Sequence, residues 1–164
     1  MLRIGLLSDT HGWWDDKYRE YFNVCDEIWH AGDIGSEEVA FRLSQIKPLR
    51  AVYGNIDGQS LRGLYPEIAC FRAEDVKVMM THIGGYPGHY APGIRKKLSD
   101  YEPRLFISGH SHILKVMYDR KPDCLHINPG TAGKSGFHQV RTLLRFTIDK
   151  REIKDMEVIE LGNR

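Results

Sequence analysis

The sequence lacks the cysteine pattern and the long apolar runs that are typical of secreted or membrane proteins. Its three cysteines, Cys25, Cys70 and Cys124, are far apart in 164 residues and form no Cys-x-x-Cys pair. A disulfide framework or a thiolate zinc site is therefore not expected. No run reaches the ~18 apolar residues that cross a bilayer, and the stretch 2–7 is too short for a secretory signal. We expect a cytoplasmic protein without a membrane partner.

An excess of charge of one sign is also lacking. Lysine and arginine total 23 against 22 for aspartate and glutamate, which gives a net charge of +1 at pH 7. Because no basic block is present, we expect no dedicated binding of duplex nucleic acid. The length predicts a single domain over residues 1–164, since folded units typically contain about 100 to 150 residues. These features are compatible with either a monomer or a homo-oligomer.

What is present in the first half is an alternation of strand-like runs and helical spacing. The runs at 2–8, 27–30 and 49–53 each end in a cluster of Gly, Asp, Asn or His. Residues 15–23 have helical spacing, and Ser36 is a candidate N-cap for a second helix. This alternation predicts parallel strands in βαβ units.

The pattern changes in the second half. Strand-like runs at 76–81 and 105–108 again end in clusters that contain His. From residue 114 onward the runs have no helical spacing and predict antiparallel strands over 114–118, 125–127, 140–148 and 152–161. The expected fold class is α/β (α+β), with two packed sheets and the helices outside.

Side chains that bind metals occupy the cluster after each of the first five runs. Ligands collect beyond the carboxyl ends of strands in open α/β sheets. The pairs Asp9-x-His11 and His110-x-His112 have a spacing of two, which points both side chains to one side of an extended backbone. Glycines precede three candidates and permit close approach of the backbone to an ion. The candidate metal ligands are Asp9, His11, Asp33, Asn55, His82, His110 and His112.

In type and order these clusters resemble those of the calcineurin-like metallophosphoesterase superfamily, in particular its small bacterial and archaeal phosphodiesterases. The family blocks D-x-H, G-D, G-N, a lone His and G-H-x-H match residues 9–11, 32–33, 54–55, 82 and 109–112. Small members also share the turn Asn128-Pro129-Gly130. The resemblance implies a four-layer αββα sandwich of two mixed sheets flanked by helices.

The resemblance also implies a role for each ligand. It gives one ion to Asp9, His11 and His112, a second ion to Asn55, His82 and His110, and the bridge to Asp33. Such a centre hydrolyses phosphate esters, more readily diesters, by in-line attack of a hydroxide that bridges the ions. Asp33, Asn55 and His110 are the expected catalytic residues.

The chemical types of the candidate ligands narrow the choice of metal cofactor. Imidazole and carboxylate ligands without thiolate suit Mn(II), Fe, Zn or Ni better than Mg or Ca, and two Mn(II) ions are expected. The expected substrate is a small phosphate ester, such as a nucleotide-like compound. The alternative is a non-catalytic metal-binding interaction module on the same fold, because the retromer scaffold subunit of eukaryotes resembles this fold and has lost catalytic competence.

The chain departs from larger family members at Ile56, where they carry a histidine after the asparagine ligand. Assistance to the leaving group then needs another source. Asp57 is either an orienter of a metal-ligating histidine or a turn residue. The Gly- and Pro-rich segment 83–93 predicts a loop at the edge of the site, with His89 and Tyr86 as candidate substrate contacts.

Other aromatic and histidine residues are assigned less active roles. Trp13 and Trp14 follow His11 closely, and one of them is expected to line the pocket while the other faces the core or a partner. Three further histidines are expected to be structural: His30, His126 and His138.

Overall fold

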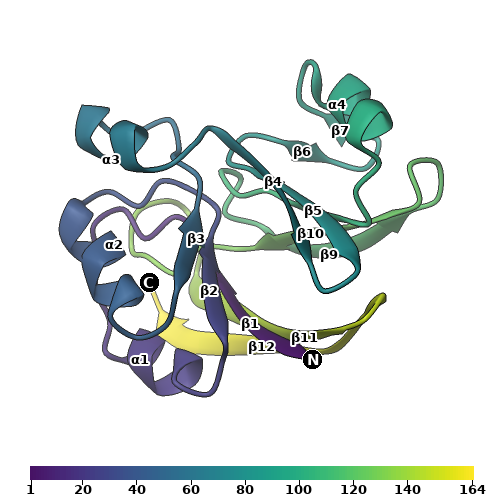
Figure 1. Cartoon of the computed structure of the whole chain (residues 1–164). Helices are drawn as coiled ribbons and strands as arrows, with labels where there is room; N and C mark the ends of the chain where they lie inside the picture. The colour runs from purple at the N-terminus through teal and green to yellow at the C-terminus, as the bar shows by residue number, and fades with distance from the viewer.

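Two five-stranded sheets pack face to face with helices outside, as the computed structural model shows for residues 1–164 (Figure 1). In the order β12-β11-β1-β2-β3, the first sheet contains β1 (Leu2–Leu7), β2 (Glu27–His30), β3 (Leu49–Ala51), β11 (Val140–Asp149) and β12 (Glu152–Asn163). In the order β4-β5-β8-β10-β9, the second contains β4 (Ile68–Ala73), β5 (Val76–Thr81), β8 (Leu105–Ile107), β9 (Leu114–Asp119) and β10 (Cys124–Pro129). The predicted sandwich of two mixed sheets is confirmed.

The helices cover the outer faces of the sheets. They are α1 (Lys17–Phe22), α2 (Glu37–Ser44), α3 (Gln59–Leu64) and α4 (Ile94–Tyr101). Helices α1 and α2 lie on the first sheet and α4 on the second (Figure 1). The predicted cap of α2 is confirmed, because the Ser36 hydroxyl accepts a hydrogen bond from the Val39 N–H. None of the four helices combines the length and the apolar composition that a membrane-spanning helix requires.

Alternating side chains of the strands build separate core layers. Ile4 and Leu6 of β1 point between the sheets and pack with Trp29 of β2 and with residues of the second sheet. Leu7 of β1 points outward and packs in the layer under α1 and α2. The period of two thus buries both faces of β1, which explains its nearly continuous apolar sequence.

Three details differ from the sequence-based expectations. Strand β10 pairs in parallel with β8, whereas only antiparallel pairing was expected in this half. The reason is that the chain crosses from β8 to the sheet edge as β9 and returns as β10 between them. Helix α3 and strand β4 were not predicted. The expected loop at 83–93 contains a small hairpin of β6 (Gly85–Tyr86) and β7 (His89–Tyr90).

The absence of a side chain at Gly5 lets α1 approach β1, and a Gly5→Ala substitution tests this packing. A Cβ at Gly5 would lie 2.2 Å from Cδ1 of the buried Phe22. We expect Gly5→Ala to lower the free energy of unfolding by about 1–3 kcal/mol, measured by urea denaturation. The control is Gly63→Ala in α3, where a Cβ meets nothing within 4 Å. This control should be neutral or stabilising by about 0.5–1 kcal/mol, and equal effects of both substitutions would contradict the packing argument.

Candidate metal centre

The candidate ligands lie in loops that follow strands of both sheets, at one edge of the sandwich. Asp9 and His11 follow β1, and Asp33 follows β2. Asn55 follows β3, His82 follows β5, and both His110 and His112 follow β8. Backbone contacts join these loops, because the Gly109 N–H donates to the His82 carbonyl at 3.0 Å and the Asp9 N–H to the Gly32 carbonyl at 3.0 Å. The His110 N–H donates to Asp9 Oδ2 at 3.2 Å and so connects the two sheets.

The backbone of these loops is locally strained. Asp9, His11, Asp33, His110 and His112 have positive φ angles between 46° and 71°. They are five of the ten non-glycine residues with positive φ in the chain. A left-handed conformation costs about 1–2 kcal/mol for such a residue, and strain of this kind clusters at functional sites. In these loops, the strained backbone directs the ligand side chains toward a common point.

Glycines next to the candidate ligands leave space for other site residues. Gly32 has φ = 101°, and a Cβ there would lie 2.7 Å from His82 Nδ1. A Cβ at Gly54 would lie 2.1 Å from Asp33 Oδ1. Each residue that precedes Asp33 or Asn55 must therefore lack a side chain for the loops to meet.

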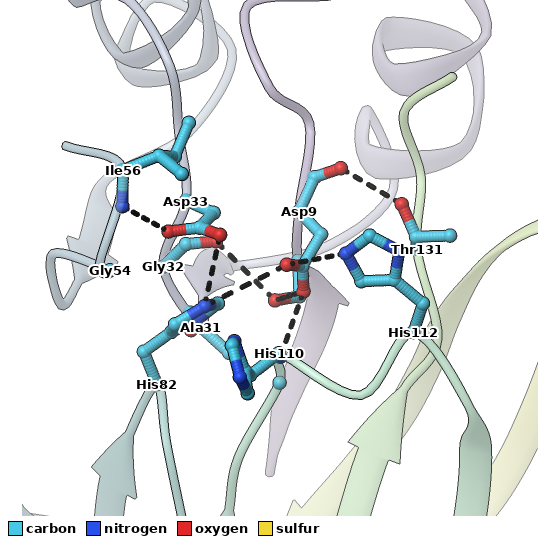
Figure 2. A network of polar contacts seen from close by, with 12 residues as sticks. Asp9, Ala31, Gly32, Asp33, Gly54, Ile56, His82, His110, His112 and Thr131 are labelled. Atoms are coloured by element: carbon cyan, nitrogen blue, oxygen red, sulfur yellow. Dashed lines mark hydrogen bonds and ion pairs between the residues drawn. The ribbon is translucent and has the colours of Figure 1, made fainter. Parts of the chain in front are cut away.

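A first group of possible ligands surrounds Asp9. Its Oδ1 lies 3.1 Å from His112 Nε2 and 3.7 Å from His11 Nε2. One ligand atom from each of these three residues lies within 4.8 Å of the other two, close enough to bind a single ion. Figure 2 shows the His112 ring directed at the Asp9 carboxylate.

A second group surrounds Asp33, whose carboxylate also lies near His11 of the first group. Asp33, His82 and His110 offer ligand atoms within 4.8 Å of one another. Asp33 Oδ2 lies 3.1 Å from His82 Nε2 (Figure 2). The same oxygen lies 3.3 Å from His11 Nε2, so it lies beside a histidine of each group. Asp33 Oδ1 accepts the Ile56 N–H at 3.0 Å, which fixes the orientation of the carboxylate.

The donor atoms fit divalent metal ions. Nε2 of His11 and Nε2 of His82 are buried and have no hydrogen-bond partner. His82 Nδ1 lies 2.8 Å from the Ala31 carbonyl, an acceptor that places the ring proton on Nδ1 and leaves the Nε2 lone pair free. Metal-ligating histidines are held in this way by backbone carbonyls. Imidazole and carboxylate donors together suit a divalent transition ion.

Electrostatics at the centre favours bound cations. Burial opposes ionisation of Asp9, but its contacts with His11, His112 and Ser8 outweigh burial and hold its pKa well below the usual range. Burial likewise opposes ionisation of Asp33, yet its contact with His82 lowers the pKa of Asp33 overall. Both carboxylates are therefore negatively charged near neutral pH.

A family match extends over most of the chain. A family model described as the calcineurin-like phosphoesterase superfamily domain matches residues 2–151. The chain belongs to this superfamily. A relative described as a probable metallophosphoesterase, from Methanocaldococcus jannaschii, is 32% identical over 138 residues, which are 78% of this chain and 67% of that protein. Membership of a metallophosphoesterase family implies divalent metal ions as cofactors.

Solved structures share the fold of this phosphoesterase domain. Vps29 from Entamoeba histolytica, complexed with Zn²⁺, matches with a TM-score of 0.74 at 14% identity and covers 97% of this chain and 99% of that chain. A novel archaeal phosphodiesterase matches with a TM-score of 0.72 at 24% identity and covers 96% of this chain and all of that chain. At these identities the likenesses show the fold alone.

Two supporting residues of the phosphoesterase site were not recognised in the sequence. Asn128 Nδ2 donates to the Gly109 carbonyl at 3.1 Å and to Ser111 Oγ at 3.0 Å, and so holds the loop after β8. The Thr131 hydroxyl donates to the Asp9 carbonyl at 2.9 Å. The available signal was the Asn-Pro-Gly turn, which the sequence showed without revealing these partners.

Asp57 has a different role from the orienter of a histidine. Its carboxylate is buried and accepts the N–H groups of Ile34, Gly35 and Gly54 at 3.1, 2.9 and 2.8 Å. The orienter hypothesis is wrong, because the Asp57 carboxylate accepts hydrogen bonds from backbone amides and from no imidazole. It ties the loop after β2 to the loop after β3, and its placement in a turn agrees with the other interpretation.

Asn55 follows β3 and borders the same cavity as His82 of the second group. Its residue is exposed and lines a cavity of about 220 Å³ together with His82 and Arg62. Asn55 therefore lies near the second group, of which His82 is a member. Its assignment as a ligand remains a prediction.

The two tryptophans face different environments. Trp14 packs edge-on against Tyr18, with ring centroids 5.4 Å apart, in the layer under the first sheet's helices. Trp13 is 39% exposed, and Lys134 Nζ lies 4.0 Å from its ring centroid. Core packing by one of the pair is confirmed, while substrate stacking by Trp13 remains untested.

Tyr86 and His89 lie beside the centre on the β6–β7 hairpin. Their rings are 4.9 Å apart, and both line a cavity of about 230 Å³ that also contacts His110. Both residues are exposed, so a substrate group has access to them. Their role as substrate contacts remains a prediction.

His30 connects two ligand loops from inside the protein. Its Nδ1 accepts the Gly32 N–H at 3.0 Å, which leaves the proton on Nε2, 3.0 Å from Thr10 Oγ1. The Thr10 hydroxyl in turn donates to the Ile34 carbonyl at 2.8 Å. Complete burial lowers the pKa of His30 from 6.5 to about 4. His30 is therefore a neutral structural residue, as expected from the sequence.

The lowered pKa of His30 predicts a pH-dependent contribution to stability. The unfolded chain takes up a proton as pH falls through 6.5, whereas the folded protein does so only near 4. The stability contribution is thus complete above pH 6.5 and falls by about 2 kcal/mol by pH 5. We expect the difference in unfolding free energy between wild type and His30→Gln to shrink by this amount from pH 7 to pH 5. Urea denaturation with a chelator measures it, and a pH-independent difference would contradict a neutral His30.

Proposed function

We propose that the protein is a phosphodiesterase that holds two divalent ions in one shared centre. The observation that most directly supports this proposal is the position of Asp33 Oδ2, which lies 3.3 Å from His11 Nε2 and 3.1 Å from His82 Nε2. A single carboxylate oxygen beside both ligand groups is what a bridging ligand requires. Mn(II) is the expected ion, with Fe, Zn or Ni as alternatives, because the donors are imidazole and carboxylate.

The chain's residues bind and orient a phosphate ester in this proposal. Two divalent ions, when bound, stabilise charge on the phosphoryl group and supply a hydroxide nucleophile near neutral pH. Asp9 and Asp33 contribute two negative charges against four positive ones, so the centre retains about two positive charges and attracts an anionic ester. Asn55 and His110 lie toward solvent, where the ester enters.

The proposal leaves the departing oxygen without an obvious acid. Ile56 donates only its backbone N–H, to Asp33, and its side chain is 47% exposed and apolar. His89 in the neighbouring cavity is a candidate proton donor. A diester with a good leaving group needs this help least. Small phosphodiesters with good leaving groups are therefore expected to react fastest.

The substitution Asp33→Asn tests the shared centre. Loss of the bridging charge should reduce bound metal from two ions per chain to one or fewer, measured by elemental analysis after dialysis. Hydrolysis of bis(p-nitrophenyl) phosphate with added Mn(II) should fall by at least about 100-fold, since positioned metals carry the chemistry.

Asp100→Asn is the matched control, because Asp100 lies on α4 and pairs with Lys96 at the surface. It should retain two ions and full activity. Asp33→Asn activity within tenfold of wild type would contradict the two-ion proposal. A wild type that binds two ions and hydrolyses no ester would instead favour the non-catalytic interaction module.

A second prediction concerns the leaving group. Without an efficient acid, the rate should depend steeply on the pKa of the leaving group, and alkyl diesters should react far more slowly than nitrophenyl diesters. A positioned acid typically contributes about 10² to 10⁴-fold. The measurement is a series of diesters with graded leaving groups, under conditions where chemistry limits the rate.

His89→Ala serves as the diagnostic variant in this series. A steeper dependence would identify His89 as the acid, and an unchanged slope would restrict it to substrate contact or solvent. Equal wild-type rates for aryl and alkyl diesters would show that the site contains an efficient acid and would contradict the argument from Ile56.

A further inference from the structure

The cavity beside His110 has a basic character that phosphoryl chemistry at the centre does not require. Its floor is formed by the outer face of the second sheet, where His126 and Asn128 of β10 lie next to Lys115 of β9. Its wall is the β6–β7 hairpin with Tyr86 and His89. The lining residues include no aspartate or glutamate.

Lys115 supplies the formal positive charge of this cavity. Its Nζ lies 3.8 Å from the centroid of the Tyr86 ring, a contact that keeps the ammonium group at the cavity wall. The lysines that form ion pairs are Lys96 and Lys154, so no carboxylate of the chain neutralises Lys115. Burial holds the pKa of His126 near 4, and this imidazole is neutral.

The cavity also lies within reach of an ester bound at the centre. Strand pairing places Lys115 directly opposite Asn128, at the ~5 Å spacing of neighbouring strands. The Asn128 side chain donates to Gly109 and Ser111, the neighbours of His110 in the ligand loop. The volume of the cavity, about 230 Å³, is larger than the roughly 150 Å³ of a protein cavity that encloses a benzene ring. The cavity therefore has enough volume for a six-membered ring with a small acidic group.

We propose that this cavity binds a second negatively charged group, carried on one arm of the phosphodiester substrate, through Lys115. The inference rests on the proposed phosphodiesterase function and narrows it: the preferred substrates are diesters with an additional carboxylate or phosphate. Tyr86 holds the Lys115 ammonium in place, and Asn128 aligns the cavity floor with the ligand loop. Charge selection then depends on Lys115, which is not one of the candidate metal ligands.

Two diesters with the same leaving group test this selection: p-nitrophenyl phenyl phosphate and its 4-carboxyphenyl analogue. A 4-phosphonophenyl analogue distinguishes phosphate-like from carboxylate recognition. Wild type should prefer the acidic diesters by about tenfold in kcat/KM, mainly through KM, as a hydrogen bond to a charged group predicts. Lys115→Met should remove the preference and leave the neutral diester within about twofold.

Lys134→Met is the matched control. Lys134 also lies over an aromatic ring, that of Trp13 at 4.0 Å, but does not line the cavity. This variant should keep the tenfold preference. Thermal unfolding of both variants checks that neither substitution alters the fold.

Binding without turnover provides an independent measurement. Calorimetry on the metal-loaded protein should give an about tenfold lower Kd for 4-carboxyphenylphosphonate than for phenylphosphonate, and Lys115→Met should equalise the two. If wild type hydrolyses diesters but shows no preference in kcat/KM or Kd, the cavity inference is overturned and the phosphodiesterase proposal stands. If neither diester is hydrolysed, the function proposal fails, and the two Kd values alone decide the cavity inference. A preference that persists in Lys115→Met also overturns it.

Discussion

The negative charge of two carboxylates, Asp9 and Asp33, is buried where the two sheets meet, and the surrounding structure must offset it. Their residues are 0% and 2% exposed. Buried charges are costly unless they are paired and hydrogen-bonded. Ser8, the His110 N–H and the Ile56 N–H provide hydrogen bonds, and four imidazoles are close enough to share a cation with the carboxylates. The strained ligand loops accompany this arrangement, because five of the seven candidate ligands adopt left-handed backbone conformations.

The supporting contacts of the centre are part of the fold itself. His30 and Asp57 join loops of the first sheet from below, through backbone amides and the Thr10 hydroxyl. Asn128 and Thr131 join the second sheet's loop and the Asp9 backbone from the other side. None of these four contacts an ion directly in the proposed arrangement. These four residues fix the positions of the candidate metal ligands, so a substitution at any of them is expected to alter stability and metal binding together.

Two cavities beside the centre differ in character. In one cavity, Asn55 and Arg62 lie together with His82 and Glu67, so positive and negative side chains are mixed. The other cavity, which contains Lys115, has no acidic lining. A diester that spans the centre therefore meets a basic environment on one arm only. This asymmetry gives the proposed substrate an orientation, which a centre built from metal ligands alone would not impose.

The sequence by itself determined the local elements and the identity of the candidate ligands. The apolar run of residues 2–7 and the Ser36 cap depend on neighbours along the chain, and so do the clusters Asp9-x-His11 and His110-x-His112. The family resemblance extended this to the two-sheet sandwich. The prediction of antiparallel pairing from local patterns was wrong at β10. This strand pairs with β8 in parallel because of a crossover that no turn residue signals.

Only the tertiary structure decided which loops meet and what they enclose. The contact of His82 with Ala31 joins residues 51 positions apart, and that of Asp9 with His110 joins residues 101 positions apart. The role of Asp57 likewise depends on amides of another loop, and the Lys115 cavity depends on a hairpin folded over a distant sheet edge. Residue type fixes what a side chain can bind, and this is readable in the sequence. The distance between side chains depends on how two sheets stack, which is settled by packing over the whole core and leaves no local trace in the chain.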